Sequence, residues 1–167
     1  MPFSSLGLSP ALLRVLAEQA FSRPTAIQTD AIPAALRGDD ILGVAPTGSG
    51  KTVAFALPIL QQLAGASRRA IYSAPRRTHT LILAPTRELA QQTGALLREF
   101  AEHLGEPVKV AVLFGGVSLN PQMMALRGGA DIVVATPGRL LDLVAHNALS
   151  LAGVATLLLL LVIANLA

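Results

Sequence analysis

The sequence predicts an α/β fold in which a parallel β-sheet is flanked by helices on both faces. Short apolar runs alternate with amphipathic helical stretches along the whole chain. The apolar runs are nearly continuous, which is typical of strands buried on both sides of a parallel sheet. A length of 167 residues supports one domain with a sizeable core, so we expect residues 1–167 to form a single domain.

Two helices are predicted near the N-terminus. Ser9 and Pro10 indicate the start of the first, because serine caps helix N-termini and proline suits the first helical position. Its apolar face is expected to consist of Leu12, Leu13, Leu16 and Ala17. The second helix is predicted over Thr25–Leu36 and ends at Gly38, because glycine commonly terminates helices.

Strands and helices alternate after Gly38. Five elements are expected in this order: a strand at Asp40–Val44, a loop at Ala45–Gly50, a helix at Lys51–Leu63, a strand at Thr80–Leu83 and a helix at Arg87–His103. Three further strands are expected at Val108–Leu113, Asp131–Ala135 and Thr156–Ile163. The segment Gly65–His79 shows no periodicity and is predicted to be a surface loop. Its arginines, Arg68, Arg69, Arg76 and Arg77, are expected to face solvent.

The composition excludes several classes of protein. The absence of cysteine excludes a disulfide framework, and the three histidines, His79, His103 and His146, lack the spacing of metal ligands, so a structural zinc site is excluded. A net charge of +3 permits an anionic partner without requiring one. Only two of the 13 basic residues are lysines, Lys51 and Lys109. A lysine in a glycine-rich loop is therefore less easily explained by chance.

The two ends of the chain carry opposite implications about membranes. The N-terminus has no basic segment followed by an apolar core, so we predict no secretion signal and a cytoplasmic location. The last 25 residues, however, carry no charge. Residues 147–167 are long enough to be considered as a membrane span.

A phosphate-binding loop is predicted at Ala45–Thr52, between the expected strand and helix. It departs from the general pattern at Ala45, where that pattern has glycine. Gly48 and Gly50 allow successive backbone N–H groups to face a phosphate at the positive end of the following helix. Lys51 is expected to contact the β- and γ-phosphates, and the Thr52 hydroxyl is expected to be a Mg²⁺ ligand. The predicted nucleotide contacts in this loop are Thr47, Gly48, Ser49, Gly50, Lys51 and Thr52.

Further short stretches accompany this loop in a fixed order. Upstream are Phe3 and the stretch Ala20–Gln28, and downstream are Pro85–Ala90, Gly115-Gly116 and Thr136–Arg139. Together and in this order they resemble the first RecA-like domain of the DEAD-box ATP-dependent RNA helicases, with an N-terminus similar to the bacterial members. The resemblance extends from Phe3 to about Thr156. It implies a RecA-like P-loop NTPase fold with ATP and Mg²⁺ as cofactors.

The resemblance also implies an adenine-recognition site. The Gln28 amide offers one donor and one acceptor, which match the N6 and N7 edge of adenine, and the family's glutamine makes this contact. Phe3 and Phe21 would support the base, either by stacking or by packing the segment that holds Gln28. The alternative for both phenylalanines is an ordinary core position. Ala20 replaces the glycine that is usual in the family.

RNA binding is the second activity that the resemblance implies. Helix starts, a threonine hydroxyl and an arginine guanidinium together suit phosphate contacts, which need not read sequence. Two adjacent glycines would admit an RNA backbone closely. The residues concerned are Pro85, Thr86, Arg87, Gly115, Gly116, Thr136, Pro137, Gly138 and Arg139. The alternative at each place is a helix cap or a tight turn with an arginine in solvent.

The family's Asp-Glu-Ala-Asp motif is expected at residues 160–163, where the chain has Leu160-Leu161-Val162-Ile163. Leucine can neither organise Mg²⁺ nor activate water. The second RecA-like domain, which in the family completes the ATP site and closes over RNA, is also expected to be missing from this chain. We therefore expect the chain alone not to hydrolyse ATP or unwind RNA, with Lys51 and Thr52 as the remaining catalytic residues.

Three interpretations of the apolar tail stay open. It is a buried parallel strand in a fragment whose residues are altered there, a membrane anchor, or part of a catalytically inactive relative that still binds nucleotide or RNA. A central parallel strand is favoured by the continuous apolar character. A membrane anchor is disfavoured because flanking basic residues and interfacial Trp or Tyr are missing. The expected partners are RNA and the second RecA-like domain, with no membrane.

Overall fold

A computed structural model of the chain describes residues 1–65, 76–104 and 108–161. The chain divides into two compact units. The first consists of Met1–Ser67 with Phe100–Glu106, and the second of Arg68–Glu99 with Pro107–Ala167. The single domain over residues 1–167 stays a prediction.

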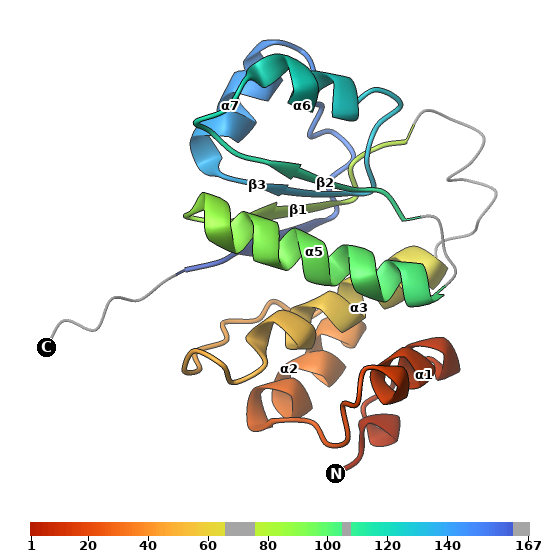
Figure 1. The fold of residues 1–167 in the computed structure, drawn as a ribbon. Coiled ribbons are helices and arrows are strands. Elements are labelled where there is room, and N and C mark those ends of the chain that lie inside the picture. Colours follow the sequence, from red (N-terminus) through yellow and green to blue (C-terminus); the bar gives the residue numbers. More distant parts are fainter. Residues whose placement is uncertain (66–75, 105–107, 162–167) are drawn as a thin grey trace, which may run out of the picture. The chain divides into compact units, whose positions relative to one another are not determined.

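The first unit is helical over most of its described length (Figure 1). A short 3-10 helix η1 (Phe3–Ser5) precedes α1 (Pro10–Glu18), α2 (Ala26–Arg37) and α3 (Lys51–Gly65). The predicted start signals are confirmed, because Ser9 caps α1 by accepting a hydrogen bond from Leu12 N at 3.4 Å. At α2, Thr25 and Gln28 form a capping box, and Gly38 ends the helix in the left-handed region with φ 83°.

The apolar face of α1 is slightly rotated from the predicted one. Leu12 and Leu16 are buried as expected, but the third buried side chain is Val15. Leu13 is half-buried and Ala17 is exposed. The helix therefore turns a Leu12, Val15 and Leu16 stripe toward its neighbours, a spacing of three and four residues that a helix places on one side.

The strand predicted at Asp40–Val44 is wrong. The structure assigns no regular element to these residues. Leu42 is 88% exposed and Val44 71% exposed, so the apolar side chains that suggested a strand are in solvent. Apolar composition favours a strand only if a neighbouring strand accepts its backbone hydrogen bonds, and in the structure this segment has no ladder partner among the described strands.

The second unit contains the parallel sheet, which confirms the α/β fold class. Its strands are β1 (Thr80–Leu83), β2 (Val110–Leu113), β3 (Ile132–Ala135) and β4 (Thr156–Leu159). They are all parallel and lie in the order β2-β3-β1-β4. Because every strand runs in the same direction, the loops that follow them emerge at one edge of the sheet.

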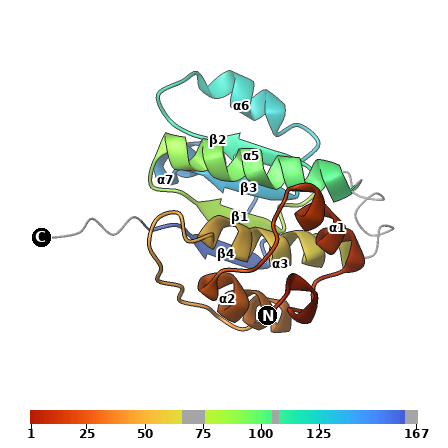
Figure 2. The ribbon, with the colours of Figure 1, turned by 60° about the horizontal axis from the view of Figure 1, so that its bottom comes forward.

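Helices cover both faces of this sheet (Figure 1). On one face, α6 (Leu119–Ala125) and α7 (Pro137–Ala145) pack on side chains of β1, β2 and β3, with Leu140 and Leu143 in the shared core. On the other lies α5 (Arg87–Leu104), whose residues from Phe100 onward are grouped with the first unit. Helix α5 approaches β2 closely at Gly94, where an added Cβ would lie 2.2 Å from Val112 Cγ2. Figure 2 shows the strands from a second direction.

Strand β4 confirms the strand predicted in the apolar tail but not its burial. It pairs in parallel with β1, and Leu160 N continues the ladder to Leu83 O at 2.9 Å. Among the described strands, however, it is the last in the order and so lies at an edge, and Leu157 and Leu159 are 58% and 54% exposed. The prediction of a buried central strand is therefore wrong. Val162 and Ile163 lie outside the described residues.

The basic loop before β1 is only partly as predicted. Arg77 is exposed, as expected for a solvated loop, and Arg68 and Arg69 lie outside the described residues. Arg76 is not solvated: its Nη1 lies 2.6 Å from Oδ2 of Asp131, whose side chain is 9% exposed. Asp131 also accepts a hydrogen bond from Lys109 N at 2.7 Å. This carboxylate thus connects the starts of three strands.

Among the helices of the described residues, none is long and apolar enough to cross a membrane.

Candidate functional site

The predicted phosphate loop lies in the first unit, directly before α3. Gly48 and Gly50 have φ of 78° and 87°, a left-handed conformation that favours glycine. A Cβ at Gly50 would lie 2.3 Å from Gln28 Nε2, whereas one at Gly48 would meet nothing within 4 Å. The loop conformation therefore requires glycine at both positions, and Gly50 is additionally constrained by its neighbour.

Lys51 donates hydrogen bonds to carbonyl groups of its own loop. Its ammonium contacts Ala45 O and also Pro46 O, the latter at 2.8 Å. These two acceptors hold the ammonium beside the loop rather than in solvent. To reach a phosphate, Lys51 has to exchange these carbonyl oxygens for phosphate oxygens, which are stronger acceptors because they are charged.

Gln28 connects the start of α2 to the phosphate loop. Its side chain is 2% exposed, its Oε1 accepts from Thr25 N at 3.0 Å, and its Nε2 donates to Gly50 O at 3.1 Å. Both ends of the amide are thus paired. The sequence predicted this amide as an adenine contact, and the structure adds a link to the phosphate loop that the sequence did not predict.

The two phenylalanines predicted beside the base occupy different environments. Phe3 is 6% exposed and belongs to the core of the first unit. Phe21 is half-buried and packs edge to face against Phe100, with ring centroids 6.1 Å apart and an interplanar angle of 79°. Their contact with a nucleotide stays a prediction.

The residues of the loop fit the phosphate groups of a nucleotide. The loop combines two glycines in the left-handed conformation, a lysine and the start of a 15-residue helix. In addition, Ser49 Oγ is buried without a hydrogen-bond partner among the described residues. A phosphate oxygen would satisfy such a group.

The loop offers few protein ligands for a Mg²⁺ ion. Thr52 offers one hydroxyl, and the described part of the chain contains no group of three or more His, Cys, Asp or Glu side chains that could hold a metal. Mg²⁺ often keeps several waters and takes phosphate oxygens as ligands. The donor set therefore suits an ion that arrives with a nucleotide, not one bound by the protein alone.

Three other predicted stretches meet at the carboxyl edge of the sheet in the second unit. Pro85–Arg87 follows β1, Gly115-Gly116 follows β2, and Thr136–Arg139 follows β3. The guanidinium carbon of Arg87 lies 6.0 Å from the centre of the Phe114 ring, within the range of a cation–π contact. A Cβ at Gly116 would lie 4.0 Å from Arg87 Nη1. The loops that the sequence predicted separately are thus neighbours.

The two threonines of these loops differ in what they bond. Thr86 Oγ1 accepts from Leu89 N at 3.2 Å and so caps α5. Thr136 is the N-cap residue of the nine-residue helix α7 but makes no side-chain cap hydrogen bond, and Pro137 has no N–H to donate. Leu140 N donates to Thr136 O at 3.0 Å, so the N–H groups of Gly138 and Arg139 before it remain available to an anion.

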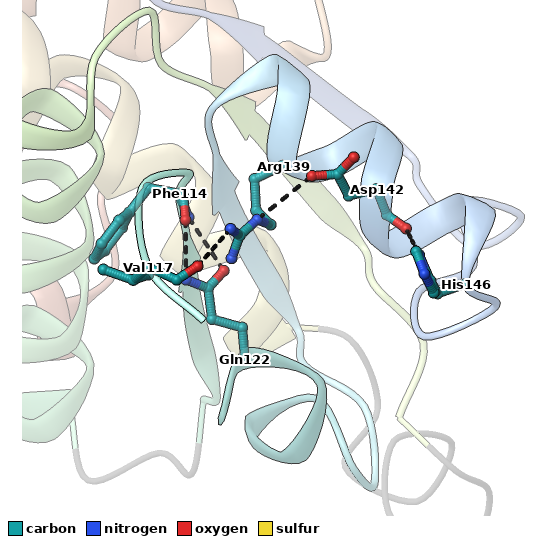
Figure 3. A network of polar contacts seen from close by, with 6 residues as sticks. All are labelled: Phe114, Val117, Gln122, Arg139, Asp142 and His146. Atoms are coloured by element: carbon teal, nitrogen blue, oxygen red, sulfur yellow. Dashed lines mark hydrogen bonds and ion pairs between the residues drawn. The ribbon is translucent and has the colours of Figure 1, made fainter. Parts of the chain in front are cut away.

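Arg139 is buried, contrary to the simple expectation of an arginine in contact with RNA. It is 7% exposed, and its Nη2 donates to Val117 O at 2.7 Å (Figure 3). Its Nε lies 3.7 Å from Asp142 Oδ2, an ion-pair distance too long for a hydrogen bond, so Nε and Nη1 have no hydrogen-bond partner among the described residues. In this arrangement the guanidinium holds Val117, the residue that follows Gly116.

A family model described as DEAD/DEAH box helicase matches residues 25–163. The chain belongs to the DEAD/DEAH box helicase family. The yeast DEAD-box splicing factor Prp28 is similar in structure, with a TM-score of 0.82 and 37% sequence identity over 95% of this chain. The chain spans 38% of the length of that protein.

The first two residues of the stretch where the acidic motif is predicted are apolar in this DEAD/DEAH box helicase chain. Leu160 and Leu161 follow β4 at the carboxyl edge of the sheet, and Leu161 is 74% exposed. A leucine side chain has no atom that accepts a hydrogen bond from water or binds a metal ion. Residues 160 and 161 therefore provide no group for hydrolysis.

One residue of the site was missed from the sequence. Gln122, on α6, pairs with both backbone groups of Phe114, next to Gly115 (Figure 3). Helix α6 itself was not predicted. A signal was present nevertheless: Gln122 is a polar residue within the apolar stripe of Leu119, Met123 and Leu126. A polar side chain in such a position needs a partner.

Proposed function

We propose that this chain is the ATP-binding and RNA-contacting N-terminal domain of an ATP-dependent RNA helicase. In the intact protein, ATP binding would bring two RecA-like domains together on RNA and open a short duplex. The observation that carries the proposal is that three separate loops predicted to contact RNA lie together at one sheet edge, with Arg87 beside Phe114. The domain's location in the cytoplasm stays a prediction.

Nucleotide binding is assigned to the phosphate loop. Thr47, Gly48, Ser49, Gly50, Lys51 and Thr52 would hold the phosphates, and Mg²⁺ bound with ATP would supply charge neutralisation between the phosphate oxygens. Gln28 would exchange its bonds for those of adenine, with Phe3 and Phe21 nearby in the sequence motif. If the Gln28 amide contacts the base, ADP should bind more tightly than GDP. Guanine presents an acceptor at the position where adenine presents its N6 donor.

A calorimetric titration with ADP and GDP tests this assignment. Gln28→Ala should bring the two affinities together. Thr25→Ala is the matched control, because it also breaks the capping box of α2 but leaves the amide in place. Equal affinity of the unchanged chain for ADP and GDP would remove the role of Gln28.

RNA binding is assigned to Pro85, Thr86, Arg87, Gly115, Gly116, Thr136, Pro137, Gly138 and Arg139. The buried side chain of Arg139 would act through its hydrogen bond to Val117 O and not by touching the RNA. The contacts would be to the phosphate backbone, so affinity should vary little with sequence. Fluorescence anisotropy with a labelled single-stranded oligonucleotide measures this directly. Arg87→Ala should weaken binding, and an unchanged affinity would place the RNA site elsewhere.

A binding module without turnover is the second candidate, and Leu160 and Leu161 favour it. Without an acid at these positions, bound ATP would persist. A phosphate-release assay on the full-length gene product with ATP, Mg²⁺ and RNA distinguishes the two candidates. Release above that of a Lys51→Ala control would contradict the inactive module.

A further inference from the structure

The loop from Phe114 to Val117 is held at both of its ends. At the first end, Phe114 N donates to Gln122 Oε1 at 3.3 Å and Gln122 Nε2 donates to Phe114 O at 3.0 Å. At the second, Val117 O accepts from Arg139 Nη2 at 2.7 Å. Gly115 and Gly116 lie between these two fixed points, as Figure 3 shows for the residues that flank them.

The Gln122 contact replaces a strand pairing. Strand β2 ends at Leu113, whose carbonyl still accepts from Thr136 N at 2.9 Å. Phe114 is therefore the first residue past the ladder, and both its backbone groups would otherwise need other partners. One primary amide supplies both a donor and an acceptor, as a neighbouring strand would. Gln122 thus gives Phe114, one residue past the end of the ladder, the two hydrogen bonds that a neighbouring strand would give it.

Few contacts fix the two glycines themselves. Both are exposed, and the N–H of neither donates to another described residue. Gly116 has φ of 79°, and a Cβ at Gly115 would meet nothing within 4 Å. Two consecutive residues without a Cβ have large conformational freedom, so their orientation depends on what holds the flanking residues.

We propose that Gln122 is a positioning residue for RNA binding, because it holds Phe114 and so presents the backbone N–H groups of Gly115 and Gly116 to an RNA phosphate. Gln122 does not touch the RNA. Because Gln122 already restricts the loop in the free protein, the loop loses less conformational entropy when RNA binds. RNA affinity therefore rises without a new contact. Arg139 does the same at Val117. This inference rests on the proposed function, since it needs RNA at the Gly115-Gly116 loop.

Gln122→Met tests the proposal, because methionine has a similar length and removes both hydrogen bonds without adding charge. Anisotropy with a labelled single-stranded oligouridine should show a loss of RNA affinity of about five- to tenfold, while ADP affinity is unchanged. Asn120→Met is the matched control: it is also an amide on α6, it is exposed, and it should leave RNA affinity unchanged.

A second variant covers the case in which Gln122→Met does not fold. Gln122→Asn keeps the amide but is one methylene too short to reach both groups of Phe114, so RNA affinity should fall by a similar factor. Amide hydrogen exchange provides a readout of position rather than of stability. It should accelerate at Phe114 to Val117 in the Gln122 variants, with no change in the strands.

The outcomes separate the inference from the proposed function. If Arg87→Ala weakens RNA binding and both Gln122 variants do not, Gln122 is not a positioning residue. If none of the three variants weakens RNA binding, the RNA site lies elsewhere and the proposed function fails with the inference. Equal losses of RNA and ADP affinity in the Gln122 variants would indicate general destabilisation, which also overturns the proposal.

Discussion

The two candidate ligand sites differ in how their donor groups are used. In the first unit, Lys51 donates to carbonyls of its own loop and Gln28 to Gly50 O. In the second unit, the side chain of Thr136 makes no capping bond and the N–H groups of the two glycines have no partner among the described residues. A ligand of the first site must therefore displace internal hydrogen bonds, whereas a ligand of the second meets donors that are already free.

The two units also differ in net charge. By sequence, the second unit has nine basic and four acidic residues, and the first has four and six, so the net charges are +5 and −2, which together give +3. The modest excess of the whole chain thus conceals a basic unit. This distribution suits a polyanion at the second unit and a more specific, locally determined phosphate site at the first.

The largest effect is expected at the framework of the second unit. Asp131→Ala removes the acceptor of Arg76 and of Lys109 N, and breaking such a buried pair should lower the free energy of unfolding by about 3 kcal/mol. Thermal unfolding followed by circular dichroism measures the change. Asp142→Ala is the control, because that carboxylate is 60% exposed and its ion pair with Arg139 is 3.7 Å long. Equal effects of the two substitutions would show that the buried contact does not stabilise the unit.

Lys51→Ala should have the next largest effect, on nucleotide affinity. Charge-assisted hydrogen bonds to a phosphate contribute roughly 2 kcal/mol, so ADP affinity should fall by about thirtyfold. Affinity for RNA should be unchanged. The control is Lys109→Ala, which removes the other lysine, and a similar loss of ADP affinity there would mean that overall charge rather than the loop binds the nucleotide.

Substitutions of the two glycines of the phosphate loop, Gly48 and Gly50, should have smaller and unequal effects on stability. Gly50→Ala forces a side chain into a conformation with φ of 87° and against Gln28 Nε2, and should cost about 2 kcal/mol. Gly48→Ala has the same conformational strain at φ 78° without the contact, and should cost about 1 kcal/mol. Chemical denaturation gives both values. If the two costs are equal, Gln28 yields readily and does not constrain the loop.

The smallest effect is a change in salt dependence. The affinity of the basic unit for single-stranded RNA should fall steadily as salt rises, and Arg87→Ala should reduce the slope of log K against log salt by about 0.7, the value for one phosphate contact. Anisotropy titrations at four salt concentrations measure the slope. A slope that Arg87→Ala leaves unchanged would argue against a phosphate contact by this residue.

Local signals in the sequence predicted much of the fold. The strand Thr80–Leu83 has the predicted bounds, and the capping residues Ser9 and Gly38 lie where helices begin and end. These features depend on neighbouring residues only. The failures involve pairing at a distance: Asp40–Val44 has strand composition but no ladder partner, and β4 has the composition of a central strand but lies at an edge.

The candidate site shows the same division. The glycines of the phosphate loop and the starts of α5 and α7 follow from local patterns. The burial of Arg139 and the pairing of Gln122 with Phe114 do not, because they depend on how α6 and α7 pack on the sheet. The bond from Gln28 to Gly50 joins residues 22 positions apart and was equally inaccessible from the sequence.

The most direct test of two separate sites is a nuclear magnetic resonance titration of the 167-residue chain labelled with nitrogen-15. Backbone glycine signals lie in a distinct region of the spectrum and report on both sites. ADP should shift the signals of Gly48 and Gly50, and a single-stranded oligoribonucleotide should shift those of Gly115, Gly116 and Gly138. The account is contradicted if RNA leaves these three signals in place, or if ADP leaves the phosphate-loop glycines unchanged.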